Sequence, residues 1–373
     1  MASFFFKRNP KTPSELVRTL NEQVTKFDTS SDRKKLQDET ARYLNSIKVI
    51  LNGDEDNDPQ PDNIAQLAQE VYQTDLLFNL IVNLSNLEFD SRKDVSSLFS
   101  TLLRRQIGNR SPTVDYLVAN PKVLRLLMRG PEIPNIALIT GAILRDCIRV
   151  ESLAAILLDD PTFWKYFDFS KKGTFENITD AFQTLSDLML THKQLTARWL
   201  RKNSVNFVRH INSLISSNSY VTKRQSIKFL SQILLDRLFR EFMLLYVDSP
   251  ENLKLVMILL SDKSKNLQVD SFNVFKIFIA NPGKSKPVLD ILAKNKDKLL
   301  QFLENFNPAD RKDDKVFREE MEFVIQRVNE LPRIKVNNGN VSPNNNPNHY
   351  GLQGQSYLNN NSATTNSSNN DMT

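Results

Sequence analysis

Residues 250–282 read PENLKLVMILLSDKSKNLQVDSFNVFKIFIANP, and this stretch decides the fold. Its first half carries Leu253, Val256, Met257 and Leu260, apolar residues with the spacing of one face of an α-helix. A serine-proline pair opens the stretch and an asparagine-proline pair closes it, and proline cannot continue a helix. The stretch therefore predicts helices joined by short connections, without a strand between them.

The same pattern recurs along most of the chain. Apolar residues repeat with helical spacing in residues 64–72 and 299–306, and no comparable run alternates with a period of two. Further breakers lie at Asn120-Pro121, Gly130-Pro131, Asp160-Pro161 and Asn307-Pro308. Such helices bury their apolar stripes against one another, in a bundle or in a stacked solenoid, and the length favours the solenoid. Armadillo and HEAT repeats of about 40 to 47 residues would divide it into roughly seven units, without a clean internal sequence repeat. We predict an all-α, armadillo/HEAT-like helical repeat solenoid.

Composition excludes several classes of protein. With 40% hydrophobic residues in 373 the chain can bury a large core, but 9 glycines are few for the nucleotide loops of α/β folds. A single cysteine, Cys147, rules out an intramolecular disulfide. The apolar run from Phe4 to Phe6 is too short for a signal peptide, and no segment approaches a membrane span. We expect a cytoplasmic protein that does not insert into membranes.

Two segments differ from the helical pattern. The scaffold domain is predicted over residues 1–335, and the asparagine-rich residues 336–373 are predicted to be a disordered tail, since they hold few apolar side chains. Residues 52–63, NGDEDNDPQPDN, combine acidic residues with two prolines and predict an exposed loop between helices.

The acidic loop resembles the opening of a calcium site without completing it. Asp54, Asp56 and Asp58 occupy positions one, three and five of an EF-hand loop. Pro59 stands where the loop needs glycine and Ala65 where it needs a bidentate glutamate. We therefore predict a solvated loop that binds no calcium.

Other catalytic or cofactor motifs are also incomplete. Gly283-Lys284-Ser285 ends like a phosphate-binding loop, but Phe278 stands where the first glycine is required. Neither Cys147 nor the three histidines have metal-ligand spacing, and no catalytic triad, carboxylate pair or dinucleotide motif can be assembled. The histidines are His192, His210 and His349. We expect no cofactor, no metal and no enzymatic activity.

Residues 221–239, VTKRQSIKFLSQILLDRLF, are the first candidate for partner binding. Arg224 and Lys228 lie four residues apart and share one helix face, and Lys223 and Arg237 add to its basic character. The buried stripe of this helix is predicted to consist of Ile227, Leu230, Leu234 and Leu238. A solvated charged face is the commoner interpretation of such a pattern. Position in a solenoid favours partner binding, because inner helices line a groove.

A second candidate site for partner binding lies in residues 250–282. Met257, Phe272, Phe275 and Phe278 cannot share one narrow stripe, so some of them are expected in the core. If one or two line a groove beside a cluster of lysines, an apolar pocket with a basic rim would suit an aromatic and acidic peptide. The lysines are Lys254, Lys294 and Lys298.

Several long blocks carry a family resemblance. They read NPKTPSELV, IAQLAQEVY, DVSSLFSTLLRRQIGNRSPTVDYL, GAILRDCIRVESLAAILL and YVTKRQSIKFLSQILLDR, together with the opening stretch. Over roughly residues 3–333 the chain resembles the calcium-binding protein 39 (Mo25) family, including its fungal hymA-like members. The resemblance implies a crescent of armadillo-like repeats without catalytic activity. It also implies a scaffold that binds and allosterically activates a germinal-centre (sterile-twenty-type) kinase or pseudokinase.

The resemblance also implies where partners bind. Lys223, Arg224 and Lys228 in KRQSIK and Arg237 in LLDR would belong to a concave kinase-binding surface. Met257 in PENLKLVM would help form a pocket for a Trp-Glu-Phe-like peptide, with Lys294 and Lys298 as candidates for its acidic residue. Residues 238–240 differ from the animal relatives, the asparagine-rich tail has no counterpart in the family core, and scaffolding in the family does not require calcium.

In the cell, the resemblance implies a pathway for fungal polarised morphogenesis and cell separation. We expect a protein that is monomeric alone and concentrated at sites of polarised growth and division. An RNA-binding helical repeat protein remains the alternative, motivated by the net charge of +6, from 49 basic and 43 acidic residues, and by the asparagine-rich tail. The kinase-scaffold interpretation expects no nucleic-acid partner.

Overall fold

The computed structural model describes residues 12–54, 58–306 and 314–332, all within a unit that spans Met1–Arg333. In these ranges every regular element is helical, and the β-type pairing is limited to a bridge between Ile107 and Arg110. The predicted all-α repeat fold is confirmed. The predicted tail, residues 336–373, and the Asn307-Pro308 breaker lie outside the described residues.

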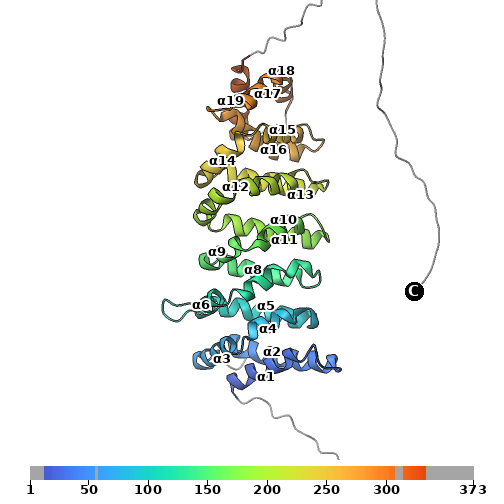
Figure 1. Ribbon diagram of the computed structural model, residues 1–373, viewed down its shortest axis with the longest axis vertical. Coiled ribbons are helices and arrows are strands. Elements are labelled where there is room, and N and C mark those ends of the chain that lie inside the picture. Colours follow the sequence, from blue (N-terminus) through green and yellow to red (C-terminus); the bar gives the residue numbers. More distant parts are fainter. Residues whose placement is uncertain (1–11, 55–57, 307–313, 333–373) are drawn as a thin grey trace, which may run out of the picture. The chain divides into compact units, whose positions relative to one another are not determined.

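Seven helices form a row that runs along this unit in chain order (Figure 1). The row helices from α2 to α11 pack successively against each other, as do α13, α16 and α19, and Phe182 of α11 contacts Phe229 of α13. The row consists of α2 (Arg33–Asn52), α5 (Phe89–Arg104), α8 (Ala137–Ile148), α11 (Phe175–Leu190), α13 (Tyr220–Leu235), α16 (Lys265–Ala280) and α19 (Lys315–Asn329). We call the solvent-exposed side of these helices the row face.

The remaining helices connect the row and cover its other side. Those in the first half are α1 (Pro13–Thr25), α3 (Pro61–Gln73), α4 (Leu76–Val82), α6 (Pro112–Ala119), α7 (Lys122–Met128) and α9 (Glu151–Asp159). Those in the second half are α10 (Tyr166–Phe169), α12 (Lys193–Ile215), α14 (Arg240–Val247), α15 (Pro250–Leu260), α17 (Lys286–Lys294) and α18 (Lys296–Glu304). Short 3-10 turns are η1 (Leu84–Asn86), η2 (Gly130–Glu132), η3 (Pro161–Lys165) and η4 (Arg237–Phe239).

Local sequence sets the helix ends as predicted. Pro250 is the first residue of α15, where its missing N–H costs nothing, and Ser249 Oγ accepts a hydrogen bond from the amide of Asn252. Ser264 caps α16 in the same way, and that helix ends at Ala280, just before Asn281-Pro282. The breakers within the described residues therefore fall at helix boundaries.

Row helices are buried over a broad arc, because each one has neighbours along the row and a covering helix behind it. Phe272, Phe275 and Phe278 of α16 are all fully buried. These three phenylalanines are core residues and line no groove, which leaves Met257 as the groove candidate of the four. Small Ser226 and Ser271 are also fully buried, and each hydroxyl donates to the carbonyl four residues earlier.

Polar pairs link neighbouring row helices at the row face. Lys48 bonds to Asp94, Ser100 to Asp146, Arg224 to Asp270 and Lys276 to Glu320, and the paired residues stand 44 to 46 positions apart in the sequence. This separation agrees with the period expected for armadillo and HEAT repeats. The structure thus reveals a repeat that the sequence hides.

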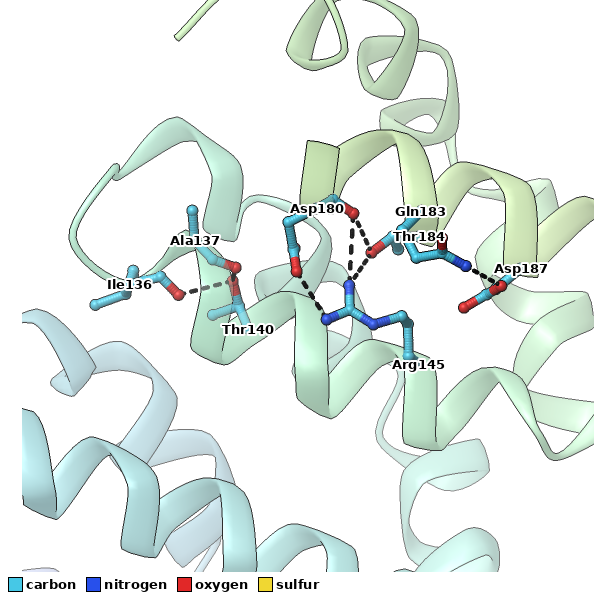
Figure 2. Close-up of polar contacts among 8 residues, drawn as sticks. All are labelled: Ile136, Ala137, Thr140, Arg145, Asp180, Gln183, Thr184 and Asp187. Atoms are coloured by element: carbon cyan, nitrogen blue, oxygen red, sulfur yellow. Dashed lines mark hydrogen bonds and ion pairs between the residues drawn. The ribbon is translucent and has the colours of Figure 1, made fainter. Parts of the chain in front are cut away.

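Arg145 of α8 and Asp180 of α11, 35 positions apart, form a further link between row helices that is largely enclosed (Figure 2). Arg145 donates through Nη2 to Asp180 Oδ1 at 2.7 Å and through Nη1 to Thr184 Oγ1 at 2.8 Å.

Within the described ranges, none of the helices has the length and apolar character needed to cross a membrane.

Candidate partner-binding surface

Helix α13 presents the first predicted site. Ser219 Oγ caps its start by accepting from the amide of Thr222, and Ile227, Leu230 and Leu234 are buried as predicted. Leu238 is not part of that stripe and is 49% exposed. The helix ends at Leu235, and Asp236 Oδ1 accepts from the amide of Leu238 to start η4, so the helical spacing no longer applies there.

Arg224 lies on the row face, held by the next row helix. Its Nε donates to Asp270 Oδ2 at 3.0 Å, and this bond raises the pKa of the guanidinium group. The side chain remains 42% exposed. Because one carboxylate fixes one edge of the planar guanidinium, the remaining N–H groups are oriented before any partner arrives.

The other predicted cations of this surface differ in exposure and in position. Lys228 lies one turn beyond Arg224 on the same face of α13 and is exposed. Lys223 is mostly buried and points toward Asp262, with Nζ 3.8 Å from the carboxylate. Arg237 is exposed in η4, beyond the end of α13. The structure therefore brings Arg224 and Lys228 together and leaves Lys223 and Arg237 apart from them.

Two neighbours of Arg224 were not predicted from the sequence. Asp270 orients Arg224 from 46 residues away, a separation that only the repeat period could have suggested. Tyr220, the first residue of α13, is exposed, interacts electrostatically with Arg224 and accepts a hydrogen bond from Ser264 Oγ at 3.2 Å. An aromatic residue directly after the Ser219 cap was the available signal.

The second predicted site spreads over three helices. Met257 of α15 is partly buried and packs against the core, while its neighbour Ile258 is 68% exposed. Lys294 is the last residue of α17, which packs against α15, and Lys298 lies on α18. Both lysines are exposed. The contact between α15 and α17 brings the helix of Lys294 against that of Met257, and the basic rim stays a prediction.

Lys296 shows why these lysines could not be distinguished by sequence. It lies between Lys294 and Lys298 but is only 8% exposed. Its Nζ donates at 2.7 Å to the carbonyls of Asn329 and Leu331, at the end of α19. Lys296 is therefore structural and takes no part in the candidate rim.

The rejected motifs have structural roles. Lys284 Nζ donates to the carbonyls of Ile279 and Asn281 and so caps the C-terminal end of α16. Cys147 is fully buried, and burial raises its thiol pKa to about 12, which suppresses the reactive thiolate.

The histidines and the acidic loop do not assemble a metal site in the described residues. His192 Nε2 bonds to the carbonyl of Ile148, and His210 stacks on Trp164. No group of three or more potential ligands gathers in the described part of the chain. Asp56 of the rejected calcium loop and His349 lie outside it.

The matches to known proteins span the residues of both predicted sites. A family model described as Mo25-like matches residues 4–332. Protein HYM1 of Saccharomyces cerevisiae is 41% identical over 357 residues, covering 92% of this chain and 89% of the relative. Calcium-binding protein 39-like of Homo sapiens is 42% identical over 331 residues, with 88% and 97% covered. Conidiophore development protein hymA of Emericella nidulans is 38% identical over 362 residues, with 89% and 94% covered.

Proposed function

Because the chain belongs to the Mo25-like family, we propose that it binds and allosterically activates a germinal-centre, sterile-twenty-type kinase or pseudokinase. Members of this family are non-catalytic scaffold proteins, so the chain is not an enzyme. The name of the Emericella relative connects that protein with conidiophore development. Polarised morphogenesis and cell separation form part of the proposal, as does a cytoplasmic location at sites of growth and division.

The observation that carries the proposal is the pair of cations on α13. Arg224 is oriented by Asp270 and partly exposed, and Lys228 lies beside it in solvent. Two preorganised cations on one rigid helix suit an acidic or hydrogen-bonding surface on a folded partner. Tyr220 adds an exposed aromatic ring at the start of the same helix.

Activation needs no catalytic group from the scaffold. A kinase is active when the glutamate of its αC helix pairs with the lysine of its β3 strand. A surface that binds only this arrangement shifts the kinase population toward it. A peptide bound near Met257 would add a second attachment point and raise the effective concentration of the kinase domain.

We expect Arg224→Ala to reduce kinase stimulation while leaving the fold intact. The pair with Asp270 is partly exposed and contributes on the order of 1 kcal/mol or less to stability, so the helix should remain folded. The measurement is phosphorylation of a generic substrate by a purified sterile-twenty-type kinase, with and without the full chain, alongside circular dichroism. Arg209→Ala, an exposed arginine on α12, is the matched control. Full stimulation by folded Arg224→Ala would refute the assignment of this surface.

We expect Met257→Ala to weaken capture of a Trp-Glu-Phe peptide by about 2 kcal/mol, the usual contribution of an apolar interface anchor. The measurement is fluorescence anisotropy of a labelled peptide with the full chain. A peptide with alanine in place of both aromatic residues serves as the control and should bind neither protein. Equal affinity of wild type and Met257→Ala would remove Met257 from the pocket.

The cations of the row face give little support to the RNA-binding alternative. Lys48 and Lys276 each lie within 3.1 Å of a carboxylate, so their charge is already offset by an acidic neighbour. Nucleic-acid binding would show a steep dependence on salt. We expect a titration with single-stranded RNA to detect no binding at moderate salt.

A further inference from the structure

Successive row helices meet at contacts that we call joints (Figure 1). At every joint but one, a polar pair of side chains links the two helices. These pairs are Lys48–Asp94, Ser100–Asp146, Arg145–Asp180, Arg224–Asp270 and Lys276–Glu320. The exception is the joint between α11 and α13, in the middle of the row, where no hydrogen bond or ion pair of the described residues joins the two helices directly.

The α11–α13 joint is also loosely packed. Every other pair of successive row helices packs broadly, whereas α11 and α13 share only marginal contact. Phe182 of α11 meets Phe229 of α13 edge to face, with ring centroids 5.8 Å apart. The row is therefore held together least firmly at this joint.

The joints on either side show which positions face each other across a joint. Gly141 of α8 lies so close to Asp180 of α11 that a Cβ atom on the glycine would overlap the carboxylate. Arg224 of α13 donates to Asp270 of α16. In both cases the fifth residue of one row helix meets the sixth residue of the next.

Thr179 and Gln225 occupy these two positions at the α11–α13 joint, and they are as far apart in the sequence as Arg224 and Asp270. Thr179 Oγ1 and Gln225 Oε1 are both buried, and neither has a hydrogen-bond partner among the described residues. A buried polar atom without a partner costs free energy until it finds one. A threonine hydroxyl and a glutamine carbonyl can bond to each other, so this joint holds the two halves of a polar pair that is not made.

Behind the row face, the same joint is closed. Phe167 of α10 packs edge to face against Phe207 of α12, with centroids 5.8 Å apart. Thr222 Oγ1 of α13 donates to the buried carbonyl of Ser170 at 3.3 Å. These contacts connect the two parts of the row at a distance from the unmade pair, as a pivot does.

We infer that the α11–α13 joint is a hinge of the row. The helices from α2 to α11 move as one part and those from α13 to α19 as the other, because polar pairs link each part throughout. In the closed state the Thr179 hydroxyl donates to Gln225 Oε1, and in the open state the two side chains are apart. The inference concerns the free chain and needs no kinase, although a partner with a fixed surface would select one of the two states.

Distances between two spin labels on the free full chain test the hinge. Cys147 is fully buried, so labels attach to introduced cysteines. Leu138→Cys with Lys265→Cys places labels on α8 and α16, across the hinge. Lys34→Cys with Glu176→Cys is the matched control, because it labels α2 and α11, the same number of joints apart within one part. All four side chains are exposed. We expect the pair across the hinge to give a distance distribution about twice as wide as the control, by double electron–electron resonance.

Variants of the unmade pair test its role as the latch. Thr179→Val keeps the shape of the side chain without the hydroxyl, so the shorter distances across the hinge should disappear. Thr191→Val is the control and should change nothing, because the Thr191 hydroxyl bonds within its own helix. Thr179→Arg combined with Gln225→Asp installs an arginine–aspartate pair like that of the next joint. This double variant should narrow the distribution to the width of the control pair.

Several outcomes would overturn the inference. Equal widths for the two label pairs in the wild type would show that the α11–α13 joint is as rigid as the others. An unchanged distribution in a folded Thr179→Arg, Gln225→Asp protein, judged by circular dichroism, would exclude these positions as the latch. If that protein does not fold, Thr179→Val decides, since a distribution equal to that of the wild type would exclude the latch. None of these outcomes bears on the kinase assay with Arg224→Ala.

Discussion

His210 is a titratable residue whose behaviour depends on its aromatic neighbours. Its ring stacks on Trp164, with centroids 5.0 Å apart, and also contacts Phe167. Burial lowers its pKa below the ordinary 6.5, nearby Asp168 raises it, and Arg209 and Lys171 lower it further. The net effect is that the folded protein favours the neutral imidazole.

We expect His210→Phe to reduce the loss of stability on mild acidification. In the wild type the unfolded chain takes up a proton as pH falls through about 6.5, before folded His210 does, so the unfolding free energy falls with pH. Phenylalanine keeps the stacking and removes that titration. The measurement compares urea midpoints of both proteins at about pH 7.5 and pH 5.5. Equal losses in the two proteins would show that His210 does not contribute.

At the scale of elements, the contact between α8 and α11 depends on Gly141. A Cβ atom at this position would overlap Asp180 Oδ2. The Asp180 carboxylate cannot move freely, because Arg145 holds it at 2.7 Å (Figure 2). The glycine therefore allows the two row helices to approach and form their enclosed ion pair.

We expect Gly141→Ala to destabilise the protein by about 1–3 kcal/mol, the usual cost of overpacking a close contact. Within an exposed helix the same change would stabilise by about 1 kcal/mol, so the sign of the effect is diagnostic. Gly283→Ala is the control, since its Cβ would meet only Asn281 Oδ1, at 3.8 Å. The measurement is urea unfolding. A stabilised Gly141→Ala protein would disprove the close approach of α8 and α11.

At the scale of the whole molecule, stability is built from contacts between neighbours. The main helix contacts join adjacent members of the row or a row helix to its cover. A chain of ring contacts runs from Phe163 through Phe167 and Phe207 to Phe242 and Tyr246, and it ties the middle of the unit together. In such a stack a local defect is expected to remain local.

We therefore expect Lys296→Met to loosen only the C-terminal end of the described unit. It would leave the carbonyls of Asn329 and Leu331, the latter buried, without their donor, at a cost of about 1–3 kcal/mol. Hydrogen exchange should accelerate in α19 and stay unchanged in α2 and α5. Lys298→Met on the same helix is the control, because that side chain is exposed. Acceleration spread evenly over all helices would contradict the modular picture.

The helical repeat fold could be predicted from the sequence, because its signals are local. Helical spacing of leucine and isoleucine, serine caps and proline breakers act within a few residues, and the described helix ends followed them. The long family blocks also identified the family before any geometry was known. Local signals likewise placed Arg224 and Lys228 on one helix face, since a spacing of four residues is a property of the helix itself.

Tertiary structure alone decided which of the candidate residues are available to a partner. Lys294, Lys296 and Lys298 look alike in the sequence, yet packing against α19 buries one and leaves two in solvent. Asp270 orients Arg224 although the two residues lie 46 positions apart in the sequence. Burial and orientation depend on what stacks beside a helix, and that information is spread over whole repeats rather than over neighbouring residues.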